Sequence, residues 1–157
     1  MAMLTQTGAI VVGKGQGRTL TAHNNSVELK VTGAETGGDY ALLDYHSAAG
    51  FPGPAPHIHE RTDELFYVLE GEVTFWVGGE TSVAGAGTSV FIPRGVPHTF
   101  STPTGPARFL NLLTPAGFEG YFVGLAEAVA RNDGRSLREI AAEAARGYDI
   151  LLTAAHP

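Results

Sequence analysis

The stretch of sequence that decides the fold reads PAPHIHERTDE and runs from Pro54 to Glu64. Within it, a single residue, Ile58, separates His57 from His59. Alternate residues of a β-strand face the same side of a sheet, so a strand here would turn both imidazoles toward one point and Ile58 away from it. The pattern therefore predicts a strand at this position that carries half of a potential metal site.

Two further candidate ligands lie later in the chain. Glu64 begins the apolar run Leu65–Leu69, and a small loop before that run would return its carboxylate to the two imidazoles. His98 belongs to a different predicted strand, which a barrel would bring within bonding distance. Three imidazoles and one carboxylate suit a divalent transition metal and leave coordination positions open for a substrate.

Each histidine also has an ordinary interpretation. A histidine on a strand is commonly a surface residue or a hydrogen-bonded core residue, and one His-x-His pair does not by itself separate these cases from a ligand pair. His23, His46 and His156 have no partner at ligand spacing, so we interpret them as surface residues.

The segments around this stretch have the pattern of an all-β fold. Short apolar or alternating runs occur at Val27–Val31, Tyr40–Tyr45 and Val73–Val77, with glycine-containing turns between them. The chain has 21 glycines among its 157 residues, about twice the usual share, as many tight turns require. Many short strands joined by such turns predict an antiparallel sandwich or barrel.

Beyond the predicted barrel, which covers about residues 8–114, the pattern becomes helical. Apolar residues recur at helical spacing from Phe118 to Val129, which predicts a first helix. Ser136, followed three residues later by Glu139, forms a capping box that predicts the start of a second helix. We expect these two helices, within about residues 115–157, to pack on the barrel and complete one domain that spans the whole chain.

Composition excludes several function classes. Ten lysines and arginines against 16 aspartates and glutamates give a formal net charge of −6, which argues against nucleic acid and an anionic membrane as partners. The chain has no cysteine and therefore no disulfide, thiolate metal site or cysteine nucleophile. No run of 18 apolar residues and no signal-peptide pattern occurs, so we expect a cytoplasmic protein without a membrane span. The segment Gly13–Thr19 does not fit a phosphate-binding loop, because Lys14 comes before Gly15 and Gly17 instead of following the glycines and preceding a serine or threonine.

The first histidine segment resembles the first of two sequence motifs of the cupin superfamily. That motif has two histidines, a glutamate and a glycine, separated by one, four and six residues. Here these four residues are His57, His59, Glu64 and Gly71. The glycine that usually opens the motif is one residue out of step, at Gly50, and Gly53 can share its role.

The second cupin motif has a similar counterpart. Five residues separate Gly87 from Pro93, one residue separates Pro93 from Gly95, and two residues separate Gly95 from His98. Thr102 stands where the family pattern often has asparagine, but that position is not a ligand. Both spacings fit, so the resemblance is specific.

The resemblance implies a small antiparallel jelly-roll barrel that holds one divalent metal. Its ligands would be His57, His59, Glu64 and His98. This ligand set is compatible with Fe, Ni, Mn, Co, Cu and Zn and does not identify the metal. The family resemblance also implies a homodimer, and Val27–Val31 is a candidate for the edge strand.

The two C-terminal helices resemble the tail of single-domain cupins of the quercetin 2,3-dioxygenase-like group. This implies a metal-dependent dioxygenase that takes O2 and a flavonol-like or other aromatic small molecule. Glu64 would then be a permanent ligand or a catalytic base. Two alternatives stay open, because a fold does not determine a reaction. They are a redox-neutral cyclase or isomerase with a polyketide-type substrate, and a non-catalytic protein that binds a small molecule.

Aromatic residues are the candidates for the substrate pocket. If Glu64 faces the interior, strand alternation turns Phe66 the same way. The other candidate wall residues are Phe75, Phe91, Phe100 and Trp76. Each of these rings has the alternative of ordinary core packing, and Arg94 and Arg108 can either meet an anionic substrate or form ion pairs.

Overall fold

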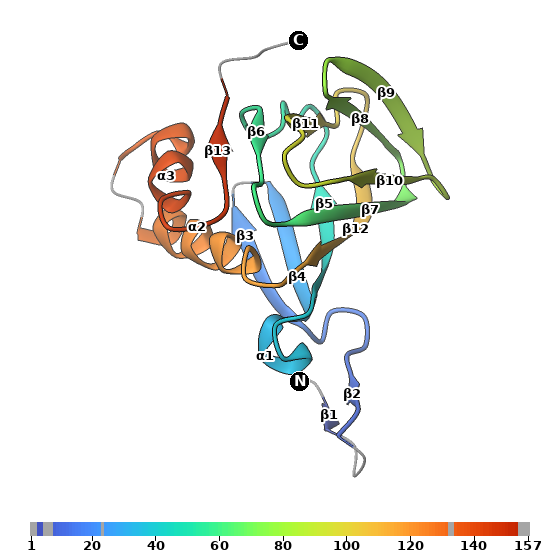
Figure 1. Cartoon of the computed structure of the whole chain (residues 1–157), viewed down its shortest axis with the longest axis vertical. Coiled ribbons are helices and arrows are strands. Elements are labelled where there is room, and N and C mark those ends of the chain that lie inside the picture. The colour runs from blue at the N-terminus through green and yellow to red at the C-terminus, as the bar shows by residue number, and fades with distance from the viewer. Residues whose placement is uncertain (1–2, 5–7, 23, 132–133, 154–157) are drawn as a thin grey trace.

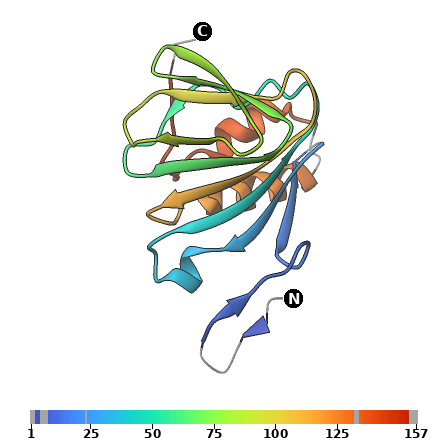
Figure 2. The same cartoon turned by 90° about the vertical axis from the view of Figure 1, so that its right-hand side faces the viewer.

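The computed structural model of the chain describes residues 3–4, 8–22, 24–131 and 134–153. In these ranges, two large antiparallel sheets pack face to face, and two helices lie beside them near the C-terminal end of the chain (Figures 1 and 2). The predicted antiparallel β-barrel with two C-terminal helices is confirmed. None of the helices in the described ranges has the length and apolar composition that crossing a bilayer requires.

The larger sheet has six strands in the order β10-β7-β12-β5-β4-β3. Their bounds are β3 Arg18–Ala22, β4 Asn25–Val31, β5 Ala41–Ser47, β7 Asp63–Glu70, β10 Ser89–Ile92 and β12 Ala107–Thr114. Every second residue of β12 is buried, which is the alternation of a strand with one face on a core. This sheet therefore presents one apolar face to the interior.

The smaller sheet has five strands in the order β13-β6-β11-β8-β9. Their bounds are β6 His57–Ile58, β8 Glu72–Val77, β9 Glu80–Gly85, β11 His98–Ser101 and β13 Leu151–Leu152. His98 of β11 lies directly opposite His57 of β6. On the other edge of β6, Leu152 of β13 lies opposite His57. The strand β13 is not predicted by the sequence, because two apolar residues have no legible period.

The remaining elements lie outside the two sheets. Strands β1 (Met3–Leu4) and β2 (Ile10–Val11) form a separate hairpin that extends from the barrel (Figure 1). The helices are α1 (Gly33–Thr36), α2 (Glu119–Arg131) and α3 (Leu137–Ala144). The predicted capping box is present: Ser136 accepts a hydrogen bond from the backbone of Glu139, whose carboxylate accepts one in return.

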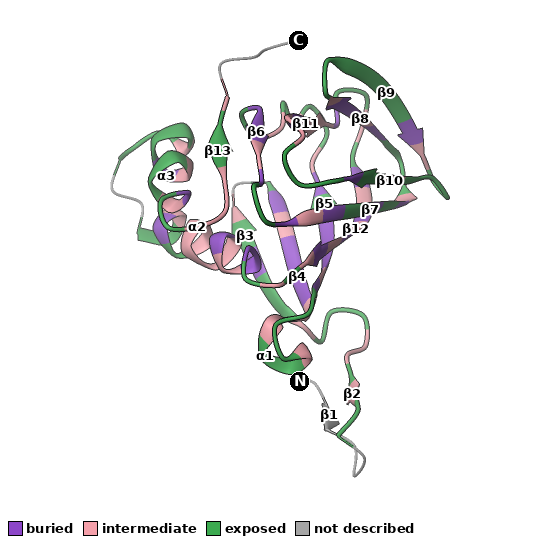
Figure 3. Ribbon diagram, in the orientation of Figure 1, coloured by how far each residue is buried: buried purple, intermediate pink, exposed green. Residues whose placement is uncertain are grey.

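Aromatic rings fill much of the interior between the sheets. Figure 3 shows buried positions recurring along the strands that face one another. Tyr45 stacks on Phe109, with ring centroids 4.8 Å apart and planes 7° apart. Phe100 meets both of these rings edge-on, at centroid distances of 5.6 Å and 5.3 Å. The interior is therefore a connected aromatic cluster.

A close backbone approach depends on Gly53, which precedes β6. Its φ is +88°, and a Cβ at this position would lie 1.7 Å from the carbonyl oxygen of Phe100. Gly50 also has a positive φ, of +73°, but open space surrounds it. Gly53 is therefore the glycine that lets this segment pack against β11.

The prediction that Val27–Val31 forms an edge strand is wrong. Strand β4 lies between β3 and β5, and β10 and β3 are the edges of that sheet. The sequence pattern did not indicate β3, which pairs with β4 from Arg18 opposite Leu29 to Ala22 opposite Asn25. The homodimer stays a prediction, which sedimentation of the purified protein would test.

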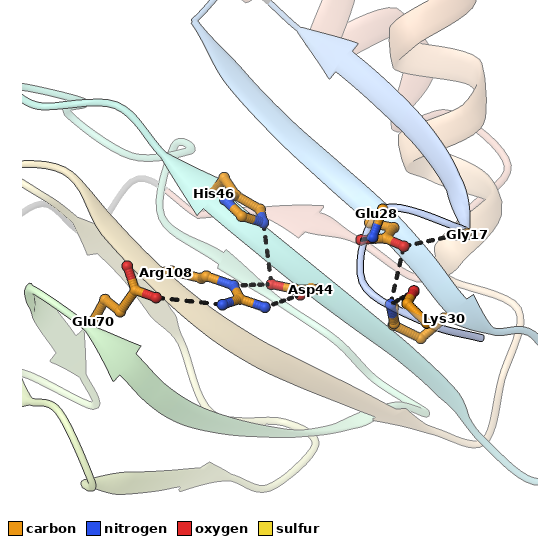
Figure 4. A network of polar contacts seen from close by, with 9 residues as sticks. Gly17, Glu28, Lys30, Asp44, His46, Glu70 and Arg108 are labelled. Carbon is orange, nitrogen blue, oxygen red and sulfur yellow. Dashed lines mark hydrogen bonds and ion pairs between the residues drawn. The ribbon is translucent and has the colours of Figure 1, made fainter. Parts of the chain in front are cut away.

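Ion pairs on the outer face of the larger sheet use both candidate arginines. Arg108 of β12 donates to both carboxylate oxygens of Asp44 at 2.9 Å and 2.7 Å, and to Glu70 at 3.3 Å (Figure 4). Burial raises the pKa of Asp44, but the hydrogen bonds from Arg108 outweigh it and hold the pKa below its ordinary value. Arg94 likewise pairs with Asp63 at 2.8 Å. The ion-paired alternative therefore holds for both arginines.

The glycine-rich N-terminal segment is held by a carboxylate of the chain itself. Glu28 of β4 accepts hydrogen bonds from the backbone N–H groups of Gly15 and Gly17, and Lys30 donates to the carbonyl of Gly13 (Figure 4). These glycines thus bind an internal anion, in agreement with the absence of a phosphate-loop pattern.

We expect Arg108→Ala to lower the free energy of unfolding by about 2–3 kcal/mol, because the Asp44 side chain, 3% exposed, would keep a buried charge without its partner. The folded-state pKa of Asp44 is lowered, so its contribution is present above the unfolded-state pKa and is lost as pH falls through the folded-state value. In urea unfolding, the difference in the free energy of unfolding between Arg108→Ala and wild type should therefore become smaller as the pH is lowered. Arg94→Ala, which removes a half-exposed arginine, is the control and should cost less than about 1 kcal/mol. Equal losses in the two variants would contradict the prediction.

Candidate functional site

The four predicted ligands meet in the barrel interior. His57 lies in β6, His59 follows that strand, Glu64 lies in β7 and His98 lies in β11. All four residues are buried, between 1% and 5% exposed. One potential ligand atom from each lies within 4.8 Å of those of the other three. Residues from two sheets therefore converge on a single point.

The cluster has the dimensions of a divalent metal site. The Oε2 atom of Glu64 lies 2.9 Å from Nε2 of His98 and 3.6 Å from Nε2 of His59. The three imidazole centroids are 4.4 Å to 5.3 Å apart. Donor atoms bound about 2.1 Å from one ion are about 3 to 4 Å apart, so only small side-chain movements would be needed to surround one.

Backbone carbonyls orient all three imidazoles. Each Nδ1 is hydrogen-bonded to a carbonyl oxygen, which accepts and cannot donate, so the proton is on Nδ1 and Nε2 is left for another partner. The pairs are His57 with Ala55, His98 with Val96 and His59 with Asp149. The Nε2 atom of His59 is buried and has no hydrogen-bond partner among the described residues. A buried polar atom of this kind is expected to have a partner, and a metal ion would supply it.

The charges of the cluster suit a cation. Burial lowers the pKa of His57 to about 4, so its imidazole is neutral near pH 7. Burial alone would raise the pKa of Glu64, but the hydrogen bond to His98 and the electrostatic influence of the neighbouring imidazoles lower it. Burial likewise opposes protonation of His98, but Glu64 outweighs it and raises that pKa. These directions favour a protonated His98 that donates from Nε2 to an ionised Glu64. Metal binding at Nε2 would displace that proton, so metal affinity should fall on acidification.

Three of the four predicted pocket phenylalanines face the interior. Phe66 contacts Phe75 at a centroid distance of 5.1 Å and Phe100 at 5.9 Å. The expected interior position of Phe91 is wrong, because this residue is 60% exposed. Phe91 lies opposite Leu65 in the sheet, and the alternation that turns Phe66 inward turns both of these residues outward.

The other histidines are not part of the cluster. His46 is on the outer face, where its Nε2 lies 3.3 Å from Asp44. Its interpretation as a surface residue agrees with a side chain that is nearly half exposed. His23 and His156 lie outside the described residues.

Two residues that contact His59 of the cluster, Phe118 and Asp149, were not predicted from the sequence as site residues. The ring of Phe118 lies 4.4 Å from the ring of His59, although the pattern indicated only a helical apolar residue. The carbonyl of Asp149, 90 positions from His59, accepts the hydrogen bond of that imidazole. A lone aspartate so far from the motif carries no sequence signal of this contact.

The carboxylate of Asp149 also organises the loop between β6 and β7. It accepts hydrogen bonds from the backbone N–H of Glu60 at 2.9 Å, the backbone N–H of Arg61 at 2.8 Å and the hydroxyl of Thr62 at 2.8 Å. This loop connects His59 to Glu64. Asp149 therefore supports the relative position of two cluster residues.

A cavity of about 400 Å³ lies next to Phe118. Its walls include Thr62, Phe118 and the segment Gly147–Asp149. Phe118 both lines this cavity and contacts His59, whereas none of the four cluster residues lines the cavity.

Comparison with known proteins yields related sequences. A family model described as Cupin domain matches residues 44–113. A quercetin 2,3-dioxygenase of Aspergillus japonicus is 32% identical over 113 residues, which cover 67% of this chain and 32% of that protein. A quercetin 2,3-dioxygenase of Bacillus subtilis is 25% identical over 126 residues, which cover 78% of this chain and 37% of that protein. The chain thus spans about a third of the length of these curated relatives.

A solved structure matches over more of its length. The ethanolamine utilization protein Q of Salmonella typhimurium is 30% identical, with a TM-score of 0.59. The match covers 74% of this chain and 94% of the chain in that structure.

Proposed function

The chain belongs to the cupin family, and on that premise we propose that it is a metal-dependent dioxygenase that acts on a flavonol-like or other aromatic small molecule. The observation that carries the proposal is the buried group of four ligand atoms within 4.8 Å. It includes an imidazole nitrogen, Nε2 of His59, that has no hydrogen-bond partner within the described ranges. The similarity to two quercetin 2,3-dioxygenases supports this reaction class over others.

The residues that would hold the metal are His57, His59, Glu64 and His98. Their donor set accepts Fe, Ni, Mn, Co, Cu or Zn. When bound, the ion supplies Lewis acidity and, if it is redox-active, electron transfer between the substrate and O2. The carbonyl groups that bind the three Nδ1 atoms hold the imidazoles ready, so little reorganisation accompanies binding.

Glu64 is the proposed catalytic base. Its carboxylate is buried and its pKa is lowered, so it is ionised and able to accept a proton from a substrate hydroxyl. His98, 2.9 Å away, hydrogen-bonds the same carboxylate and keeps it oriented. Ligation and proton acceptance are alternative uses of its oxygens during one reaction.

The aromatic interior is the proposed substrate environment. Phe66 and Phe100 supply apolar walls, and Phe118 closes the side of the cluster next to the cavity. A flat, apolar molecule suits such a surface, because burying it there removes water from both faces. Phe75 lies behind Phe66 and supports it.

Oxygen uptake tests the proposal. Protein loaded with Fe, Ni, Mn, Co or Cu is incubated with quercetin without air, and O2 is then admitted. We expect oxygen consumption coupled to loss of the flavonol absorbance, and no uptake with any metal across a panel of flavonols and catechols would contradict the proposal. Turnover without O2 and with zinc would instead indicate a cyclase or isomerase, whereas binding without reaction would indicate a binding protein.

We expect Asp149→Ala to lower the affinity for Co²⁺ by about 10-fold or more, because three hydrogen bonds to the loop between His59 and Glu64 are lost. Asp149→Asn retains one oxygen acceptor and should lose less. Calorimetric titration of the metal-free protein measures both affinities. Glu80→Ala, which removes an exposed carboxylate from β9, is the control. An unchanged Co²⁺ affinity in Asp149→Ala would show that the loop holds its position without this residue.

A further inference from the structure

An asparagine lies among the apolar side chains of the barrel interior. Asn111 is on β12, only 3% exposed, on the inward face between Phe109 and Leu113. Its neighbours on the adjoining strands are Phe66 of β7 and Leu43 of β5. No motif in the sequence points to Asn111.

The side-chain amide of Asn111 is incompletely bonded. Its Nδ2 is buried and has no hydrogen-bond partner in the part of the chain that the structure describes. The buried Asn25 is different, because its Oδ1 accepts the backbone N–H of Ala48 at 2.8 Å. A buried donor without a partner destabilises the fold, so a site that keeps one is a site where a partner is expected to arrive.

The position of Asn111 relative to the metal cluster follows from strand register. Leu113, two residues further along β12, lies opposite Glu64 of β7. Asn111 therefore lies on the same inward face as Glu64, two residues along β12 from the position directly opposite Glu64. Diagonal neighbours of this kind have Cα atoms about 7–8 Å apart. A fused or linked aromatic ring system extends over such a distance.

We propose that Asn111 is a specificity-determining residue that donates a hydrogen bond from Nδ2 to an oxygen of the substrate. The substrate class is then narrower than aromatic molecules in general. It carries one oxygen at the histidine–glutamate cluster and a hydroxyl oxygen elsewhere on its ring system. The aromatic character of this substrate rests on the proposed function. The role of the Asn111 amide as a hydrogen-bond donor to a ligand is independent of that function.

The melting temperature tests the amide without any ligand. Asn111→Leu replaces the amide with an apolar group of similar size, and in the zinc-loaded protein it should raise the melting temperature by about 2–4 °C. Asn25→Leu is the matched control and should lower the melting temperature, because it leaves the backbone N–H of Ala48 without its hydrogen-bond acceptor. A fall in Asn111→Leu like that of Asn25→Leu would overturn the proposal, because it would show that the amide is already partnered within the fold.

Binding without turnover tests the specificity. Zinc-loaded protein is titrated with quercetin in the absence of O2, and Asn111→Leu should weaken binding by about 10-fold or more. The Zn²⁺ affinity should not change. For 3-hydroxyflavone, which lacks the other hydroxyl groups of quercetin, we expect the two proteins to differ by less than about twofold; a general structural defect would weaken both ligands equally.

The outcomes separate this inference from the proposed function. Equal quercetin affinity in Asn111→Leu and wild type overturns the inference even if oxygen uptake occurs. Selective loss of quercetin affinity in the variant supports it even if no oxygen is consumed. If wild type does not bind quercetin, the melting comparison decides the role of the amide.

Discussion

His98→Ala is expected to lower the affinity for a divalent metal by about 100-fold or more and to reduce oxygen uptake to background. The imidazole of His98 is opposite His57 in the sheet and hydrogen-bonded to Glu64, so it contacts both halves of the cluster. Its removal leaves three potential ligands and a buried carboxylate that has lost its nearest partner. Elemental analysis of the purified variant and titration with Co²⁺ or Ni²⁺ measure the loss.

His46→Ala is the control for this substitution. It also removes an imidazole from a strand, but on the outer face, where Arg108 still pairs with Asp44. Metal affinity and oxygen uptake should equal those of wild type. If His98→Ala retained wild-type metal content, the four-residue cluster would not be the metal site and the proposed function would lose its main support.

Glu64→Gln is the second change with a large expected effect. Glutamine keeps the shape of the side chain but removes its charge and its ability to accept a proton near neutral pH. We expect metal affinity to fall by about 10- to 100-fold and turnover at saturating metal to fall by about 10²- to 10⁴-fold. Stopped-flow turnover at increasing metal concentration separates the two losses. Glu70→Gln, on the same strand but exposed, should change neither quantity.

The pH profile distinguishes a base from a ligand at Glu64. Because the pKa of Glu64 is lowered, wild-type turnover at saturating metal should decline only on strong acidification, as the carboxylate becomes protonated. In Glu64→Gln this acidic decline should be absent from the residual turnover. Full turnover by the metal-saturated variant would exclude proton acceptance by Glu64 and leave it as a ligand only.

Local periodicity explains which predictions the structure confirms. The His-x-His spacing places two imidazoles on one side wherever the chain is extended, and the pairing of Ser136 with Glu139 marks a helix start without any distant partner. The wrong placement of Phe91 has the same origin. Strand parity relates residues within one strand, but it does not say which parity of β10 matches the inward face of β7.

The sequence by itself therefore determined the antiparallel fold, its two C-terminal helices and four residues able to form a metal site, because alternation, capping and motif spacing are properties of short segments. Only the tertiary structure decided that β13 pairs with β6 and that the carbonyl of Asp149 orients His59. It also decided that Asn111 is buried, with its Nδ2 unpartnered among the residues that the structure describes. The physical reason is that register and polar partners depend on which distant segments bury one another. A residue 90 positions away can complete a hydrogen bond that no local pattern encodes.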